Sequence, residues 1–348
     1  MNTVSEKQDI RNIDTKTLVD FLHGIGEKPF KANQIDEWLW KKSVQTFDQM
    51  SNLSLETREL LADNFSFKPI GLSGTQTSTD RTIKSVFKLH DGNLVEGVLI
   101  PSKSRITACI SSQVGCSLSC KFCATGYMER KRNLDAAEIY DQVVHIRNQA
   151  QREFNSPLTN IVYMGMGEPL LNYKNVLQSV EYITSENGLG MSAQRITVST
   201  AGIAKMIKRL ADDKVKFNLA LSLHAATDSK RNQIMPINRS NSLKSLEEAL
   251  NYYYKITRRR ITFEYILFYN FNDSIKDAEE LLKFCKKIPS KVNVIEYNPI
   301  DNADFKNSEA DTLEKFREYL EDKGVNVRVR RSRGKDIDAA CGQLANKQ

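Results

Sequence analysis

The chain has 348 residues, of which 40% are hydrophobic and 27% charged, and its 50 Lys and Arg against 43 Asp and Glu give a formal net charge of +7. This composition excludes wholesale disorder. No stretch approaches the ~18 apolar residues of a membrane-spanning helix, and residues 1–12 lack the apolar core of a secretory signal. We therefore expect a cytoplasmic protein. The mild positive charge fits an acidic partner such as nucleic acid, and it fits an ordinary solvated surface about as well.

The pattern over residues 1–72 predicts a small helical module. Thr15 is a candidate cap for a first apolar run, a second run contains Trp38, and a third follows Ser54. Basic residues that alternate with aromatic ones can grip RNA, although the local pattern favours plain packing with Trp inside and Lys outside. The basic residues are Lys28, Lys31, Lys41 and Lys42, and the aromatic ones are Phe30, Trp38 and Trp40.

Residues 73–104 are expected to form a linker followed by a β-hairpin. Gly71 to Asp80 is rich in Gly, Ser and Thr, which is typical of a linker. Ile83–Leu89 and Leu94–Ile100 are short and rich in β-formers, and the four residues between them include an Asp-Gly pair.

From residue 105 onward, predicted strands and helices alternate. Six or so strand–helix units predict an α/β fold with a parallel sheet, as in part of a (β/α) barrel, whose site lies at the carboxyl ends of the strands. The predicted strands are Ile106–Ile110, Asn160–Met164, Arg195–Ser199, Phe217–Leu223, Thr262–Leu267, Val292–Tyr297 and Val325–Val329. The predicted helices are Leu134–Gln151, Tyr173–Ser185, Ile203–Ala211, Leu243–Lys255, Lys276–Lys287 and Thr312–Lys323.

Three of the six cysteines, Cys116, Cys120 and Cys123, lie within eight residues, a spacing that suits metal binding better than disulfides. Cubane iron–sulfur clusters normally take four cysteines, so three thiolates in a C-x3-C-x2-C pattern leave one iron open to a small molecule. A structural zinc ion with Cys109 as the fourth ligand is the alternative. Cys285 fits the core of a helix.

The C-x3-C-x2-C motif, with Phe122 before its last cysteine, resembles the radical S-adenosylmethionine (SAM) superfamily. Five further segments are similar to the RlmN-type methyltransferases, which act on C2 of adenine in 23S ribosomal RNA and transfer RNA. The likeness covers nearly the whole chain and implies a partial (β/α)6 barrel over residues 105–348. These segments are Cys109–Cys116, Met164–Leu170, Ser222–Ala225, Met235–Asn238 and Asp336–Leu344.

The resemblance implies a chemistry that suits this target. C2 of adenine is an electron-poor carbon, which cannot attack a sulfonium methyl group as an ordinary nucleophile would. In the family, one SAM molecule methylates a cysteine, here Cys341, and a second yields a radical that activates this methyl group. Glu96 corresponds to the proton acceptor, and Cys109 would release the product by forming a transient disulfide with Cys341. By local pattern alone, Glu96 is a solvent-facing carboxylate and both cysteines are unreactive.

The resemblance also implies the binding residues. The segment Gly165–Pro169 lacks the third glycine of a dinucleotide fingerprint and corresponds to the loop that binds the amino group of SAM, where glycines allow close approach. The implied cofactor contacts are Gly167, Glu168, Ser199, Ser222, Leu223, His224 and Asn298. A basic run before Cys341 predicts contacts with RNA phosphates rather than a solvated strand edge, and the target base must be splayed out. This run contains Arg328, Arg330, Arg331 and Arg333.

The cofactors implied are one 4Fe-4S cluster and two SAM molecules per turnover, and the partners are RNA and an electron donor such as flavodoxin or ferredoxin. We expect a monomer without membrane contact. The sister group that methylates C8 of adenine (the Cfr type) shares the cluster and both reactive cysteines, but Pro169 and Arg331–Gly334 fit the C2 group better. A zinc-stabilised RNA-binding protein without catalysis is the more distant alternative.

Overall fold

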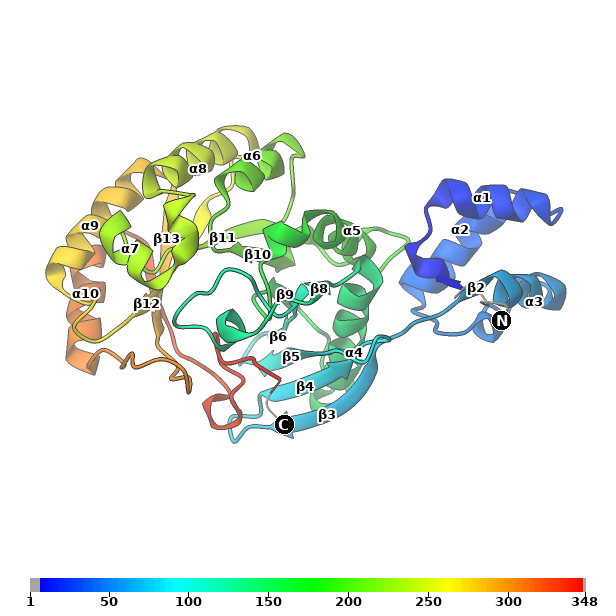
Figure 1. Ribbon diagram of the computed structural model, residues 1–348, viewed down its shortest axis with the longest axis horizontal. Helices are drawn as coiled ribbons and strands as arrows, with labels where there is room; N and C mark the ends of the chain where they lie inside the picture. Colours follow the sequence, from blue (N-terminus) through cyan, green and yellow to red (C-terminus); the bar gives the residue numbers. More distant parts are fainter. Residues whose placement is uncertain (1–6, 347–348) are drawn as a thin grey trace.

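The computed structural model describes residues 7–346, and their main body is an incomplete α/β barrel (Figure 1). Within this range seven parallel strands carry helices on their outer face, which confirms the predicted fold class. The strands are β6 (Ile106–Cys109), β9 (Asn160–Tyr163), β10 (Ile196–Thr200), β11 (Asn218–Ser222), β12 (Ile261–Leu267), β13 (Ser290–Glu296) and β14 (Val327–Arg330). The helices between successive strands are α4 (Ala136–Phe154), α5 (Tyr173–Thr184), α6 (Ala204–Asp212), α7 (Asp228–Ile234) with α8 (Leu243–Thr257), α9 (Ile275–Lys287) and α10 (Ala310–Asp322).

Alternating burial decides which side of each strand faces the helices. Val292 and Val294 on β13 are fully buried, and Phe316 and Leu320 on α10 are fully buried as well. Asn293, between the two valines, therefore points into the barrel, since successive side chains of a strand point to opposite faces. No helix among residues 7–346 is long and apolar enough to cross a membrane.

Three antiparallel strands extend the parallel sheet at β6. They are β5 (Leu94–Pro101), β4 (Ile83–Lys88) and β3 (Gly71–Thr77), and the order in the resulting sheet is β14-β13-β12-β11-β10-β9-β6-β5-β4-β3. The predicted hairpin is confirmed, but the prediction of a linker at Gly71 to Asp80 is wrong for residues 71–77. This segment is an edge strand with nearly every residue exposed, so it carries no alternation of apolar residues that would reveal a strand.

The N-terminal residues form a separate helical module beside the barrel (Figure 1). Its helices are α1 (Thr15–Gly24), α2 (Phe30–Asp36), which continues into a π-helical turn, and α3 (Leu55–Asn64), and β1 (Gln8–Asp9) pairs with β2 (Phe65–Ser66). Ser54 caps α3 as expected, whereas α1 is capped by Asp14 and not by Thr15. Residues 1–6 of the predicted module lie outside the described residues.

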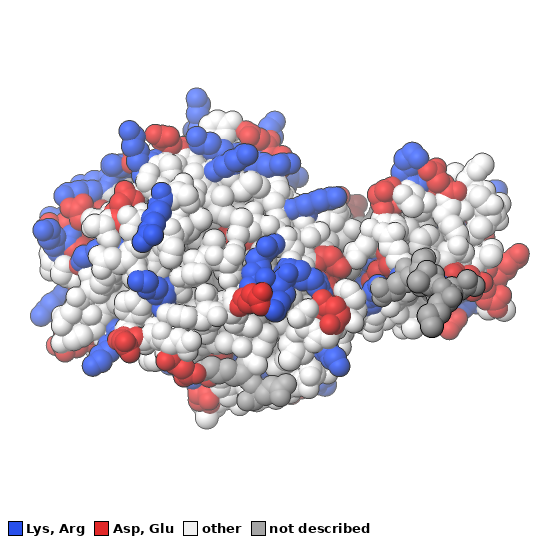
Figure 2. Space-filling view, in the orientation of Figure 1, with Lys and Arg blue, Asp and Glu red and all other residues white. Residues whose placement is uncertain are grey.

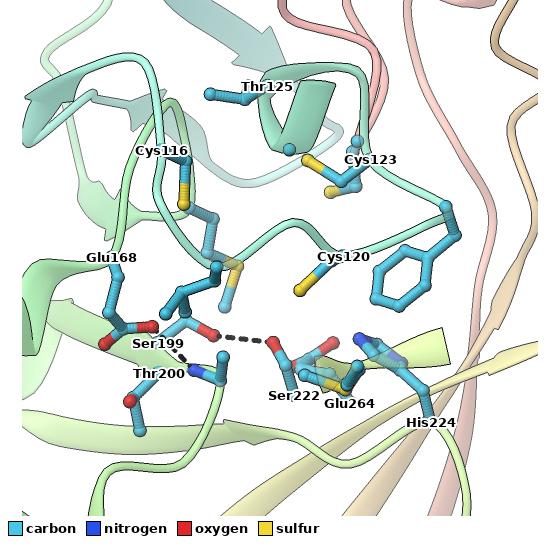
Figure 3. Close-up of a pocket in the computed structure, with 18 of the residues that line it drawn as sticks. Cys116, Cys120, Cys123, Thr125, Glu168, Ser199, Thr200, Ser222, His224 and Glu264 are labelled. Carbon is cyan, nitrogen blue, oxygen red and sulfur yellow. Dashed lines mark hydrogen bonds between the residues drawn. The ribbon is translucent and has the colours of Figure 1, made fainter. Parts of the chain in front are cut away.

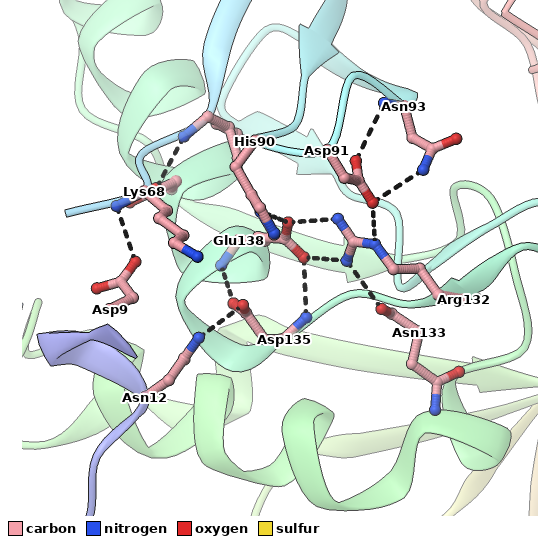
Figure 4. Close-up of polar contacts among 12 residues, drawn as sticks. Asp9, Asn12, Lys68, His90, Asp91, Asn93, Arg132, Asn133, Asp135 and Glu138 are labelled. Atoms are coloured by element: carbon pink, nitrogen blue, oxygen red, sulfur yellow. Dashed lines mark hydrogen bonds and ion pairs between the residues drawn. The ribbon is translucent and has the colours of Figure 1, made fainter. Parts of the chain in front are cut away.

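Buried polar contacts and stacked rings hold the module against α4 and α5. The Arg11 guanidinium lies 2.8 Å from carboxylate oxygens of both Asp9 and Asp141, and all three side chains are almost fully buried. Trp40 stacks on Tyr182 with ring centroids 3.5 Å apart, so packing accounts for this tryptophan. Figure 4 shows a further contact, from the Asn12 side chain to Asp135 at the start of α4.

We predict that Arg11→Ala lowers the free energy of unfolding by about 3–5 kcal/mol, because it leaves Asp9 and Asp141 buried without their cation. Lys16→Ala is the control, since the Lys16–Asp20 pair is exposed to solvent and its loss should change the free energy of unfolding little. Urea denaturation followed by circular dichroism measures both values. Equal, small losses would show that the Arg11 pair does not hold the module.

Candidate active site

Cys116, Cys120 and Cys123 line one cavity at the carboxyl ends of the parallel strands. They lie in the loop between β7 (Gln113–Val114) and β8 (Arg132–Asn133), and Figure 3 shows their thiols directed into the same space. Within this loop the Cys123 N–H donates a hydrogen bond to the Cys120 carbonyl, which closes a tight turn between the two cysteines. The sequence motif thus becomes one wall of a cavity.

Burial governs the ionisation of these three thiols. It raises the pKa of Cys116 to about 11, the pKa of Cys120 well above the ordinary value, and the pKa of Cys123 as well. Three thiols that resist ionisation side by side are suited to ligands of a metal centre, because bound metal supplies the positive charge that deprotonates them. In the described part of the chain, no three His, Cys, Asp or Glu side chains converge as ligands of a single ion do.

The segment Gly165–Pro169 forms the adjoining wall of the cavity. The Glu168 carboxylate is buried, and it accepts hydrogen bonds from the backbone N–H groups of Leu170 (3.0 Å) and Ala201 (2.7 Å). Gly167 has φ +94°, and a Cβ there would lie 2.5 Å from the Gln113 Cβ. The glycine is therefore needed to pack against Gln113, a requirement that we had expected to come from a ligand.

Five of the seven predicted cofactor contacts line this cavity: Gly167, Glu168, Ser199, Ser222 and His224. His224 accepts a hydrogen bond at Nδ1 from the Ile266 N–H, and burial lowers its pKa to about 3, so its ring is neutral. Leu223 is fully buried in the hydrophobic core. Asn298 donates from Nδ2 to the Cys341 carbonyl at 3.1 Å.

Cys109 and Cys341 line a second cavity, which lies deeper in the barrel. Cys341 also lines the first cavity, so it stands between the loop of Cys116, Cys120 and Cys123 and the Cys109 thiol. Cys109 ends β6 with 6% of its surface exposed, and burial raises its pKa to about 12. The structure thus brings together two cysteines that lie far apart in the sequence.

Glu96 lies on β5 and contacts the C-terminal segment. Its side chain is 1% exposed, and Oε2 accepts hydrogen bonds from the backbone N–H groups of Ala345 (2.9 Å) and Asn346 (3.1 Å). Oε1 has no hydrogen-bond partner among the described residues and lies 3.4 Å from the Lys84 Nζ. Glu96 is therefore a buried, paired carboxylate, and the local interpretation as a solvent-facing one is wrong.

The four predicted RNA-binding arginines separate into two pairs. Arg328 and Arg330 line the second cavity from the inner face of β14, and Arg331 and Arg333 border the same cavity from the segment after the strand. Arg331 and Arg333 lie beyond the strand, where Arg331 is 81% exposed and pairs with Glu296 at 3.0 Å, and Arg333 lies 3.8 Å from Asp80. Figure 2 shows basic and acidic side chains mixed on the visible face of the molecule, with large uncharged areas between them. The four arginines therefore do not form one continuous basic edge of the sheet.

Arg231 is a site residue that the sequence gave no reason to single out. It is fully buried on α7 and donates to the carbonyls of Leu223, Ala201 and Ser222 and to the Asn238 side chain. These bonds tie together the loops that follow β10 and β11. The nearby segment Met235–Asn238 is similar to the RlmN-type proteins, but no motif in the sequence includes Arg231.

The chain matches two family models. "Ribosomal RNA large subunit methyltransferase N-terminal domain" matches residues 8–66, and "Radical SAM superfamily" matches residues 110–285. A protein of Cytophaga hutchinsonii named "Probable dual-specificity RNA methyltransferase RlmN" is 61% identical over 347 residues, which cover 100% of this chain and 95% of that protein. One of the same name from Christiangramia forsetii is 55% identical, with 98% and 97% covered. The crystal structure of a radical SAM methyltransferase from Sphaerobacter thermophilus has a TM-score of 0.91 at 38% identity, with 98% of this chain and 100% of that one covered.

We predict that Gly167→Ala costs roughly 1–3 kcal/mol more stability than Gly190→Ala, because only the first change forces a Cβ into a packed neighbour. Both glycines have positive φ, so the backbone strain is shared, and nothing lies within 4 Å of a Cβ built at Gly190. Urea unfolding of both variants gives the difference. Equal losses would mean that Gln113 moves aside without cost.

Proposed function

Since the chain belongs to the RlmN family of radical SAM RNA methyltransferases, we propose that it methylates C2 of adenine in 23S ribosomal RNA and in transfer RNA. The observation that carries this proposal is the placement of Cys109 and Cys341 in one cavity that adjoins the three cysteines of the C-x3-C-x2-C motif. A methyltransferase with an ordinary nucleophilic substrate has no use for two such cysteines. An adenine ring carbon that must receive its methyl group from a protein sulfur does, and the similarity to proteins named RlmN favours C2 over C8.

The residues present fit a 4Fe-4S cluster held by Cys116, Cys120 and Cys123, because three half-buried thiols share one open cavity without a fourth cysteine of their motif. When bound, the cluster and SAM supply the methyl group and the radical. Glu168, Ser199 and Ser222 offer oxygens in the same cavity for the amino acid part of SAM. Leu223 would act through its backbone, whose carbonyl is held by Arg231. Asn298 would act by holding the loop that carries Cys341.

In this proposal Cys341 carries the methyl group and Cys109 resolves the covalent adduct with the RNA base. Cys341 is only partly buried and borders both cavities, so it can face the cofactor on one side and Cys109 on the other. Asn298 binds the Cys341 carbonyl and thereby positions the loop. One turnover would use two SAM molecules, one for methylation of Cys341 and one for activation.

Glu96 is proposed as the acceptor of the C2 proton. Its Oε1 lies 3.4 Å from the Lys84 Nζ, inside the sheet. Oε2 is occupied by two backbone N–H groups, so Oε1, without a hydrogen-bond partner in the described chain, is the atom that would take the proton. The last described residues, Ala345 and Asn346, must leave room for the base beside it.

RNA binding would involve the N-terminal module and the basic residues near Cys341. Residues 8–66 match a domain of ribosomal RNA methyltransferases, and Lys42 lies over the ring of Trp38, 3.4 Å from its centroid. Arg328 lines the deeper cavity and Arg333 is half exposed, so both can reach phosphates of a splayed-out nucleotide. An electron donor of the flavodoxin or ferredoxin type and a monomeric state complete the proposal.

Mass spectrometry of nucleosides from ribosomal RNA tests the function. A deletion strain should lose 2-methyladenosine, the wild-type gene should restore it, and Cys120→Ala should not, because the cluster loses a ligand. Cys285→Ala is the matched control: this cysteine lies on α9, away from both cavities, and its loss should leave activity intact. Loss of 8-methyladenosine instead would assign the chain to the C8 group.

The two reactive cysteines should fail in different ways. Cys341→Ala has no sulfur to receive the methyl group, so it should modify no RNA. Cys109→Ala can form the adduct but cannot resolve it, so it should accumulate protein joined covalently to RNA, visible on denaturing gels and removed by nuclease. Glu96→Ala must be compared, since slow loss of the C2 proton could trap the same adduct. Normal turnover by Cys109→Ala would contradict the resolving role.

A further inference from the structure

Arg330 points into the barrel, toward both reactive cysteines. On the neighbouring strands Val292 pairs with Val327 and Ile295 pairs with Arg330. Val292 and Val327 are buried on the helix-covered face, so Arg330, three residues after Val327, faces inward. It lines the cofactor cavity and the deeper cavity, as does Cys341, and the deeper one is also lined by Cys109. The Arg330 side chain is 31% exposed, whereas Arg328 is an exposed residue and the Arg331 side chain is 81% exposed, so Arg330 is the least suited of the three to a phosphate on the protein surface.

Two neighbours contact the Arg330 guanidinium in the cavity that Cys109 also lines. Its Nη1 lies 3.6 Å from Glu264 Oε2 and 3.5 Å from the Met164 Sδ. Glu264 is itself held by Asn293, whose Nδ2 donates to Oε1 at 2.8 Å. Met164 follows β9 directly, the strand on which Val162 pairs with Cys109, and its backbone N–H faces the Cys109 thiol. Both contacts are made by Nη1, so this nitrogen holds the guanidinium against Glu264 and Met164.

We infer that Arg330 is the cation that stabilises the thiolate of Cys109, and that its main role lies in resolving the covalent adduct rather than in binding RNA phosphate. The inference rests on the proposed role of Cys109 as the resolving nucleophile. The thiolate is the reactive form of cysteine, and burial alone opposes its formation. An arginine stays charged even when buried, so it can offset that cost without giving up a proton itself.

The step that benefits can be written with balanced atoms and electrons. Cys109 loses its Sγ proton to water in the cavity, and the thiolate electron pair forms the S–S bond with the Cys341 sulfur. The bond from that sulfur to the methylene carbon of the adduct breaks, and its electron pair stays on carbon. That carbon takes up a proton and becomes the methyl group. The two sulfurs are oxidised to a disulfide while the carbon is reduced.

The other charged groups that face Cys109 do not replace Arg330. On the same face of the adjoining strands, Lys84 and Glu96 pair with each other at 3.4 Å. Glu264 is the carboxylate that anchors Arg330, and Cys341 is the reaction partner. In agreement with this arrangement, Arg330 lowers the pKa of Cys109 against the larger effect of burial, and the pKa of Arg330 is raised above its usual value, mainly by Cys341.

The test measures the alkylation of Cys109 by iodoacetamide in the reduced, cluster-loaded, full-length protein between about pH 7 and pH 9.5. Mass spectrometry of the Cys109 peptide gives the rate. Loss of a neighbouring cation should shift the thiolate equilibrium by about one to three pH units, so Arg330→Gln should react roughly tenfold to a thousandfold more slowly at each pH. Arg330→Lys keeps the charge and should recover most of the rate.

Arg331→Gln is the matched control, because it removes the same charge one residue away. Arg331 also borders the second cavity, but it is absent from the first one, its side chain is 81% exposed and it pairs with Glu296 at 3.0 Å. It should leave the Cys109 rate unchanged. An unchanged rate in Arg330→Gln overturns the inference. Equal slowing in Arg330→Gln and Arg330→Lys overturns it as well, because packing rather than charge would then be the cause.

A second readout separates this inference from the proposed function. The protein–RNA adduct should persist in Arg330→Gln at neutral pH and should resolve as the pH is raised, whereas in Cys109→Ala it persists at every pH. Absence of an adduct in Cys109→Ala is a failure of the proposed function, and the alkylation rates still decide the charge effect. An adduct in Cys109→Ala together with unaltered resolution in Arg330→Gln is a failure of this inference alone.

Discussion

The hydrogen bonds that hold the C-terminal segment across the mouth of the barrel decide where the reactive groups lie. The Gly342 carbonyl accepts from the Ala124 N–H at 2.7 Å, and the Leu344 carbonyl accepts from the Thr125 hydroxyl at 2.6 Å. Both donors directly follow Cys123. The loop that would bind the cluster and the loop that carries Cys341 are therefore fixed to each other. The position of each loop depends on the position of the other. In Figure 1 the C-terminal segment (red) runs beside the loop that carries Cys116, Cys120 and Cys123.

Strand polarity explains why such distant segments can meet. Parallel strands joined by outer helices all end at one rim, so every loop that follows a strand opens on the same cavity. Residues after β9, β10 and β11 supply Glu168, Ala201 and His224. The Ala201 backbone N–H donates to the Glu168 carboxylate at 2.7 Å, which joins two of these loops directly. Arg231 adds carbonyl contacts to the same loops from below the site. The cavity is thus built by backbone geometry, and its side chains are held in place by groups that take no part in chemistry.

How much of this could be predicted from sequence depends on what each pattern encodes. Helix caps such as Ser54 and the strand–helix alternation are local, so the elements and the fold class follow from them. The three cysteines of one loop are local too. The inward direction of Arg330 depends on the register between β13 and β14, and the pairing of Glu96 with Lys84 depends on the register between β4 and β5. A single sequence records no register. For the same reason β3 was missed, since an exposed edge strand without buried positions leaves no periodic trace.

One helix, α4, sets the distance between the N-terminal module and the cavity. Arg132 lies on β8, directly after the loop that carries the three cysteines. It pairs with Asp91 in the turn of the hairpin and with Glu138 in the first turn of α4 (Figure 4). Three residues further along, Asp141 binds Arg11 of the module. The helix rises about 1.5 Å per residue, so these two clamps lie less than one turn apart on a rigid element. An RNA that contacts both the module and the cavity would therefore meet a fixed spacing, because the connection passes through a packed helix and buried ion pairs rather than through a flexible linker.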